Sequence, residues 1–185
     1  MNPAPTASQT VGPYFHIGLD WLNTGELAAP DSPGEHFKIA GCVLDGDGNP
    51  IPDALVEIWQ ADANGQFANT EDFAAPPPRF RGFGRTPTNA EGRFEFTTIK
   101  PGPVPNTEGG MQAPHLLVSV FMRGLLKRAV TRVYFPDEPR NSDDAVLQLV
   151  PADRRKTLIA RKAANGELAW DIIMQGPNET VFFDC

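Results

Sequence analysis

The fold is decided by HFKIAGCVLDGDGNPIPDALVEIWQ, residues 36–60, in which two apolar runs flank a segment rich in Gly, Asp, Asn and Pro. Such a segment favours a turn, whereas β-branched and aromatic residues favour extended backbone. The pattern therefore predicts strands over 36–44 and 54–60, joined by a turn at 45–50.

The same alternation of apolar runs and turns continues along the chain, which has 19 Pro and 17 Gly spread between the runs. A helix is predicted only over 151–161, because Pro151 suits a first turn and Asp153 complements the helix dipole. Many short strands with one late helix predict an all-β fold, an antiparallel β-sandwich with one short helix. The further strands are expected at 93–98, 115–121, 129–135, 168–174 and 180–183.

The first 35 residues differ from the rest, because five prolines oppose regular structure in a segment that is nevertheless apolar. Apolar side chains on an irregular segment need a surface to cover them. We therefore predict an irregular N-terminal arm at 1–35 that packs on a partner chain, and a single β-sandwich domain at 36–185.

Composition narrows the classes of function. The chain has 185 residues, a formal net charge of -7 and 41% hydrophobic residues, which suits one domain with its own core. Nucleic acids and anionic membranes attract basic surfaces, so neither is expected as a partner. Without a run of 18 apolar residues or a signal peptide, a cytoplasmic location is expected. Cys42 and Cys185 form neither a disulfide framework nor a zinc-site spacing.

Four stretches of the chain share a pattern with a known family. They are SQTVGPYF at 8–15, GCVLD through DALVEIWQADANG at 41–65, FRGFGR at 80–85 and TIKPGP at 98–103. In this order they resemble the signature of the intradiol ring-cleavage dioxygenases. The resemblance implies one non-haem Fe(III), held by two tyrosinates and two histidines, that binds an aromatic diol for cleavage by O2.

The chain departs from the family at the ligand positions. Phe67 and Val104 stand where the resemblance implies the tyrosines, and His115 and Leu117 where it implies the histidines. Only His115 offers a donor atom, and one neutral imidazole does not hold Fe(III) in water. We therefore expect no metal and no catalytic residue here, with Phe67 and Leu117 filling the vestigial cavity and His115 hydrogen-bonded within it. Gln112 stands where catalytic members have an arginine.

A chain with this signature and without the ligands resembles the non-catalytic alpha subunit of heteromeric family members, whose homologous beta subunit holds the Fe(III). The resemblance implies an alpha-beta oligomer in which O2 opens a small aromatic acid, protocatechuate, to 3-carboxy-cis,cis-muconate. Thr10, Gly12, Pro13 and Tyr14 of the arm are predicted to complete the partner's substrate pocket, with Arg132 as counter-charge to the substrate carboxylate. The alternatives are an arm that only clamps the interface and an Arg132 in an ordinary ion pair.

Two other functions stay open at this point. One is an active intradiol enzyme with unconventional ligands. The other is a stand-alone β-sandwich module that binds an aromatic acid or a sugar. Binding to another chain distinguishes the stand-alone module from a subunit. A subunit should co-purify with a homologous chain that has both tyrosines and both histidines, whereas the module should be monodisperse alone.

Overall fold

The structure, a computed structural model, describes residues 18–68, 79–107 and 109–184. Strands dominate the described residues, and the helices are short. The strands are β1 (His36–Leu44), β2 (Leu55–Trp59), β3 (Phe83–Pro87), β4 (Arg93–Ile99), β5 (Val104–Pro105), β6 (Met111–Gln112), β7 (His115–Phe121), β8 (Ala129–Tyr134), β9 (Arg161–Lys162), β10 (Leu168–Ala169) and β11 (Ile172–Ile173). The helices are the 3-10 turns η1 (Asp20–Leu22), η2 (Pro139–Ser142) and η3 (Arg155–Leu158), and the α-helix α2 (Ala145–Leu149). None of these helices has the length and apolarity needed to cross a membrane.

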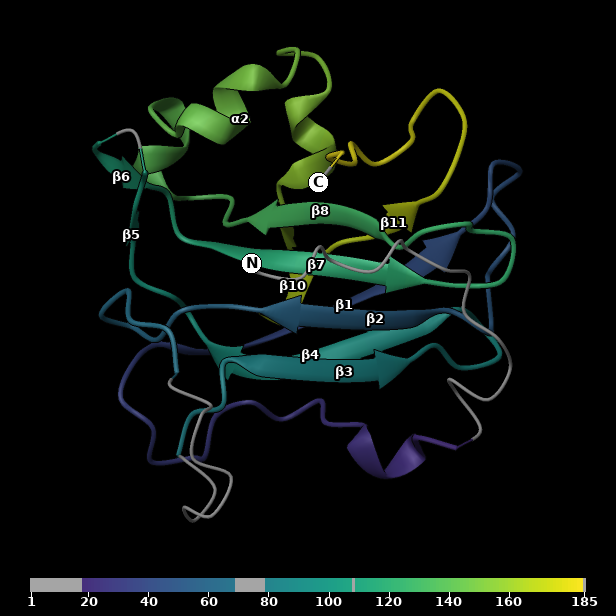
Figure 1. Cartoon of the computed structure of the whole chain (residues 1–185), viewed down its shortest axis with the longest axis horizontal. Helices are drawn as coiled ribbons and strands as arrows, with labels where there is room; N and C mark the ends of the chain where they lie inside the picture. The colour runs from purple at the N-terminus through teal and green to yellow at the C-terminus, as the bar shows by residue number, and fades with distance from the viewer. Residues whose placement is uncertain (1–17, 69–78, 108, 185) are drawn as a thin grey trace, which may run out of the picture.

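Two sheets pack against each other across one core (Figure 1). The first is antiparallel in the order β3-β2-β7-β8, and the second joins β1 to β4, β10 and β11, with β9 at its edge. Along β4, Phe94 and Phe96 are buried while Arg93 and Glu95 are exposed, as a strand with one face on a core requires. These phenylalanines belong to the same core cluster as residues of β2 and β7. The predicted all-β sandwich is confirmed.

The second sheet is not purely antiparallel, because β10 and β11 both pair with β1 in parallel. The single strand predicted over 168–174 is wrong, since it is interrupted at Trp170 and Asp171, opposite Gly41 of β1. There the Trp170 N–H donates to the Ala40 carbonyl at 3.0 Å, and the Cys42 N–H donates to Asp171 Oδ1 at 3.0 Å. A Cβ on Gly41 would lie 1.7 Å from the Trp170 carbonyl oxygen, so this crossing requires glycine.

The helix predicted over 151–161 is also wrong. The α-helix lies just before it, at Ala145–Leu149, and ends at Val150, whose backbone is extended. This ending fits the restriction that Pro151 places on the preceding residue. Downstream only the turn η3 is helical, after which the Ala160 N–H donates to the Tyr134 carbonyl and the chain follows β8. The strand predicted over 180–183 is reduced to one bridge between Phe183 and Val130.

One buried carboxyl group connects three of these segments. Asp144 is fully buried; its Oδ1 accepts from the Leu147 N–H at 2.8 Å and from the Tyr134 hydroxyl at 3.0 Å. Its Oδ2 accepts from the Ala113 N–H at 2.8 Å. Burial raises the pKa of Tyr134, so its hydroxyl remains a donor. Asp144 therefore caps α2 and holds β8 and the start of β7 against it.

Replacing Gly41 with alanine tests the crossing of β1. We expect Gly41→Ala to lower the free energy of unfolding by about 3 kcal/mol or to prevent soluble expression, because the methyl group meets backbone. Denaturant titration measures the effect. The control is Gly46→Ala in the exposed turn, where the nearest atom would be Gln175 Cβ at 3.3 Å and the change should stay within about 0.5 kcal/mol. Equal stabilities of the two variants would contradict the close approach.

Asp144→Ala should cost about 3 kcal/mol of unfolding free energy or more, because it leaves two buried N–H groups and a phenol without their acceptor. The matched variant Tyr134→Phe removes one of these donors together with its need for a partner, and should cost about 1 kcal/mol. Thermal and denaturant unfolding of both variants provide the measurement. The connecting role is refuted if the aspartate variant is no less stable than the tyrosine variant.

Candidate functional site

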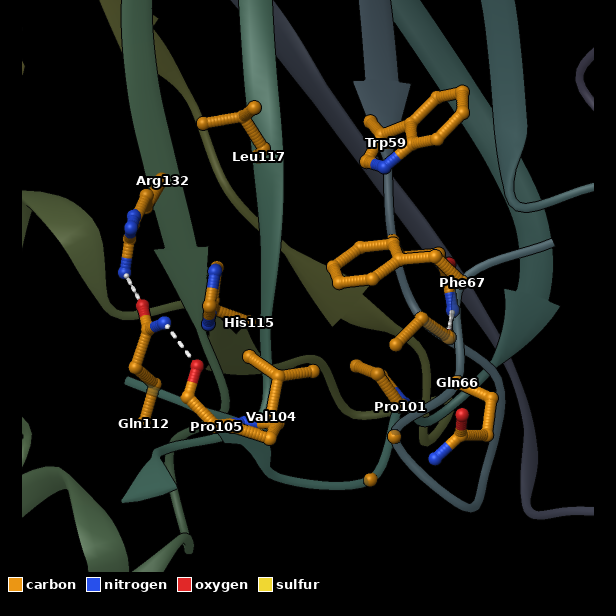
Figure 2. Close-up of a pocket in the computed structure, with 14 residues that line it drawn as sticks. Trp59, Gln66, Phe67, Pro101, Val104, Pro105, Gln112, His115, Leu117 and Arg132 are labelled. Atoms are coloured by element: carbon orange, nitrogen blue, oxygen red, sulfur yellow. Dashed lines mark hydrogen bonds between the residues drawn. The ribbon is translucent and has the colours of Figure 1, made fainter. Parts of the chain in front are cut away.

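A cavity of about 490 Å³ opens at one end of the first sheet. Figure 2 shows its walls, which come from the end of β2, the loop at 65–67, the segment 101–105, and the strands β6, β7 and β8. The two loops are held together by backbone: the Gly102 N–H donates to the Asp62 carbonyl at 2.8 Å, and the Asp62 N–H donates to the Gln66 carbonyl at 2.8 Å. These contacts define the cavity independently of its lining side chains.

All four vestigial ligand positions line this cavity, although they are far apart in sequence. Val104 is buried, whereas Phe67 is 52% exposed and Leu117 is 36% exposed. The expectation that Phe67 and Leu117 fill the cavity is therefore wrong in this chain. The Phe67 ring projects from the wall next to Trp59, on which it is stacked with 6.3 Å between ring centroids and 19° between planes (Figure 2). Loss of the ligand atoms has not closed the space.

Ferric iron does not fit this set of residues. Phe67, Val104 and Leu117 have no donor atoms, and the His115 Nδ1–H donates to the Ala113 carbonyl at 2.7 Å. Only one ring nitrogen of His115 is left as a ligand, which is too few for Fe(III). Within the described ranges, no group of three or more His, Cys, Asp or Glu side chains is arranged to hold a metal ion.

Arg132 contributes the positive charge of this cavity. It lies on β8 directly opposite Leu117 of β7, and its Nη1–H donates to Gln112 Oε1 at 2.8 Å. Gln112 in turn donates to the Pro105 carbonyl at 3.1 Å. Figure 2 shows this chain of hydrogen bonds along one side of the cavity. The ordinary ion pair considered for Arg132 is not found with any carboxylate that the structure describes.

The electrostatics of the cavity follow from two lining residues. The pKa of His115 is lowered to about 4, mainly because its imidazole is buried and secondly because the positive charge of Arg132 is adjacent. The imidazole is therefore neutral at pH 7. Among the described residues that line the cavity, Arg132 is then the one charged side chain. The arrangement offers hydrogen-bond donors and a positive charge inside a largely apolar wall.

The remaining predicted site residues have different outcomes. Thr10, Gly12, Pro13 and Tyr14 lie outside the described residues, so their role stays a prediction. Sequence reasoning missed Gln66 and Pro105 as parts of the wall. Gln66 lies in a loop and Pro105 in the two-residue strand β5, and neither segment is long enough to show a periodicity that could have placed it there. Trp59 belongs to the signature stretch at 41–65, but the sequence did not predict that it lines the cavity.

Comparisons with known proteins agree with this architecture. A family model described as Dioxygenase matches residues 11–176. The chain is 47% identical to a protocatechuate 3,4-dioxygenase alpha chain of Burkholderia cepacia, over 97% of this chain and 96% of that one. It is 36% identical to a protocatechuate 3,4-dioxygenase beta chain of the same organism, over 94% of this chain and 77% of that one.

A solved structure gives the same result for the fold. The dioxygenase domain of a dioxygenase carbohydrate-binding protein fusion from Streptomyces sp. SirexAA-E matches with a TM-score of 0.65 and 30% identity, covering 94% of this chain and 99% of that one. Family match, sequence identity and fold all agree with the quoted signature. The chain belongs to the family of the intradiol ring-cleavage dioxygenases.

Proposed function

We propose that this chain is the non-catalytic alpha subunit of a protocatechuate 3,4-dioxygenase, the structural partner of a homologous beta subunit. One observation carries the proposal: the cavity and fold of the family are kept, while three of the four ligand positions hold side chains without a donor atom. A sister chain must then supply the metal.

The division of labour follows from chemistry. In this proposal the beta subunit would hold Fe(III), and the bound ion would supply the activation of protocatechuate for intradiol cleavage by O2 to 3-carboxy-cis,cis-muconate. No step of that reaction is assigned to this chain, because its residues do not fit the ion. Similarity of the chain to both an alpha chain and a beta chain supports an alpha-beta heteromer of related subunits. A cytoplasmic location stays a prediction.

The contribution of this subunit to catalysis is assigned to its N-terminal arm. The arm predicted at 1–35 does not lie on a partner over its whole length, because Leu27 is buried in this chain's own core and its N–H donates to the Thr97 carbonyl at 2.9 Å. In this proposal the part of the arm that holds Thr10, Gly12, Pro13 and Tyr14 packs on the partner and completes its substrate pocket. Gly12 permits close approach of backbone N–H groups to a ligand. Arg132 stays a predicted counter-charge, but its hydrogen bond to Gln112 inside the chain's own cavity does not support a reach into the partner.

A stand-alone binding module is the second candidate, favoured by the open cavity. The two candidates differ in association. A module should remain monodisperse when produced together with a beta subunit, whereas the proposed subunit should assemble with it.

Co-expression with a protocatechuate 3,4-dioxygenase beta chain should give a complex with one Fe(III) per alpha-beta pair and O2 uptake on adding protocatechuate. The full chain produced alone should be colourless and take up no stoichiometric Fe(III), since tyrosinate ligands are missing. Metal analysis, visible absorption and an oxygen electrode provide the measurements. Stoichiometric iron or ring cleavage in the chain alone would refute the proposal, and failure to co-purify would favour the module.

The arm can be tested within the complex. Thr10→Ala and Gly12→Ala should raise KM for protocatechuate by about tenfold without dissociating the subunits, because each disturbs contacts around the substrate. Size-exclusion chromatography controls for assembly. If these variants weaken assembly while KM of the remaining complex is unchanged, the arm is only an interface clamp.

A further inference from the structure

We propose that the pair Asn165–Gly166 is a site of spontaneous covalent modification, at which the asparagine deamidates to aspartate and isoaspartate without an enzyme. Two Asn-Gly pairs occur in the sequence, Asn64–Gly65 and Asn165–Gly166. The fold exposes the second pair to this reaction and protects the first. The site lies in this chain alone and needs neither a metal nor a partner, so it goes beyond the proposed subunit role.

The reaction takes place between the two neighbouring residues, with water as the only other reactant. The backbone nitrogen of the glycine loses its proton and attacks the side-chain Cγ of the asparagine, which forms a C–N bond and closes a succinimide ring. The Cγ–Nδ2 bond then breaks, and the amide nitrogen takes up a proton and leaves as NH3. Water opens the ring at either carbonyl. Both products, aspartate and isoaspartate, carry one negative charge more than asparagine at neutral pH.

Both pairs lie in turns with the same backbone hydrogen bonds. The Gly65 N–H donates to the Asp62 carbonyl, and the Gly166 N–H donates to the Ala163 carbonyl, each at 3.0 Å. Both glycines have a positive φ, 78° at Gly65 and 85° at Gly166, which a residue with a side chain rarely adopts. Backbone geometry therefore does not distinguish the two pairs, and the difference comes from the groups around each turn.

The side-chain amide of Asn165 is held in place for the attack. The Glu167 N–H donates to Asn165 Oδ1 at 3.1 Å, and Asn165 Nδ2 donates to Glu167 Oε2 at 2.7 Å. The first bond closes a ring across Gly166, and its N–H stabilises the negative charge that Oδ1 gains during the attack. In the other turn the equivalent N–H, that of Gln66, donates to Asp62 Oδ1 at 2.9 Å instead.

Packing separates the two glycine nitrogens. Gly166 is exposed, and a Cβ placed on it would have no atom within 4 Å. Gly65 is buried in the cavity wall, and a Cβ placed on Gly102 would lie 2.6 Å from the Gly65 nitrogen. Base reaches the Gly65 N–H only after the two loops separate, and closure of the ring at Asn64 requires the same movement. The fold therefore protects Asn64 and leaves Asn165 reactive.

Deamidation changes the charge of the hairpin turn that joins β9 to β10. The hydrogen bond from Asn165 Nδ2 to Glu167 is lost, and a new carboxylate takes its place beside the Glu167 carboxylate, so that two negative charges repel each other. β9 and β10 share two residue pairs, and β10 in turn pairs with β1. This edge of the second sheet therefore loosens as the protein ages.

Incubation of the full chain at mildly alkaline pH, followed by peptide mapping with mass spectrometry, tests the site. We expect aspartate and isoaspartate at position 165, release of NH3 and an acidic shift on isoelectric focusing. The rate should rise with pH, because the glycine nitrogen must lose its proton. Conversion at Asn64 should be about tenfold slower or more, since it requires local opening of packed backbone. In urea, where the fold is lost, the two pairs should convert at similar rates.

Matched variants assign the acidic shift to one residue. Asn165→Gln should abolish the shift, because the longer side chain closes a ring much more slowly, whereas Asn64→Gln should leave it unchanged. Asp-Gly pairs such as Asp47–Gly48 lose water instead of NH3, so they add no charge. Asn165→Asp reproduces the charge of one product without incubation, and trypsin should cleave it after Lys162 several-fold faster than the original chain.

The site is refuted if position 165 stays unmodified while the unfolded chain converts at both pairs, if Asn64 converts as fast as Asn165 in the folded chain, or if Asn165→Gln keeps the shift. Equal cleavage of Asn165→Asp and the original chain would contradict the loosening of the sheet edge. Co-purification and ring cleavage do not depend on these results, so failure of this site is distinguishable from failure of the proposed function.

Discussion

The hydrogen bonds to the buried carboxyl group of Asp144 are the interaction on which the cavity end of the molecule depends. Asp144 accepts from the backbone at Ala113 and Leu147 and from the Tyr134 hydroxyl, so α2, β8 and the segment between β6 and β7 are tied to one group. Ala113 also accepts from His115, which brings the same network to the cavity wall. An acceptor buried in apolar surroundings is worth more than one in water, because losing it leaves several donors unpaired.

Backbone contacts explain why the cavity persists without a metal. A Cβ on Gly65 would lie 2.3 Å from the Pro103 carbonyl oxygen, and one on Gly102 would lie 2.6 Å from the Ala63 carbonyl oxygen. The two loops that form one wall therefore pack backbone to backbone, which requires glycine at both positions. The position of this wall therefore rests on backbone contacts, whereas Phe67, Val104 and Leu117 decide its chemistry.

The change of chemistry is consistent across the cavity. Donor atoms that would bind a cation are lost at three positions, while a guanidinium remains on β8 and the histidine is neutral. A wall built this way does not suit a metal ion, because three of the four positions have no donor atom and the charged side chain of the wall, Arg132, is positive. Within a heteromer, such a chain can keep the shape of an enzyme without its reaction.

The sequence by itself determined the strands whose signals are local. The strand predicted at 36–44 is β1 to the residue, and those at 54–60, 93–98, 115–121 and 129–135 match β2, β4, β7 and β8 within one residue at each end. Alternation of buried and exposed side chains, with turn residues between, is a property of neighbours in sequence. Loss of the ligand atoms was likewise readable, since it depends only on which side chains occupy four positions.

Tertiary structure alone decided the rest. The break at Trp170 and the parallel pairing of β10 and β11 with β1 depend on Ala40 and Gly41, which are distant in sequence. The position of the helix at Ala145–Leu149 differs from these, because its cap Asp144 and the following Pro151 are neighbours in sequence. The open cavity and the position of Arg132 beside Gln112 depend on the register of three strands and on two loops packed backbone to backbone. Local propensity cannot specify such contacts, because their free energy comes from groups that meet only when the chain is folded.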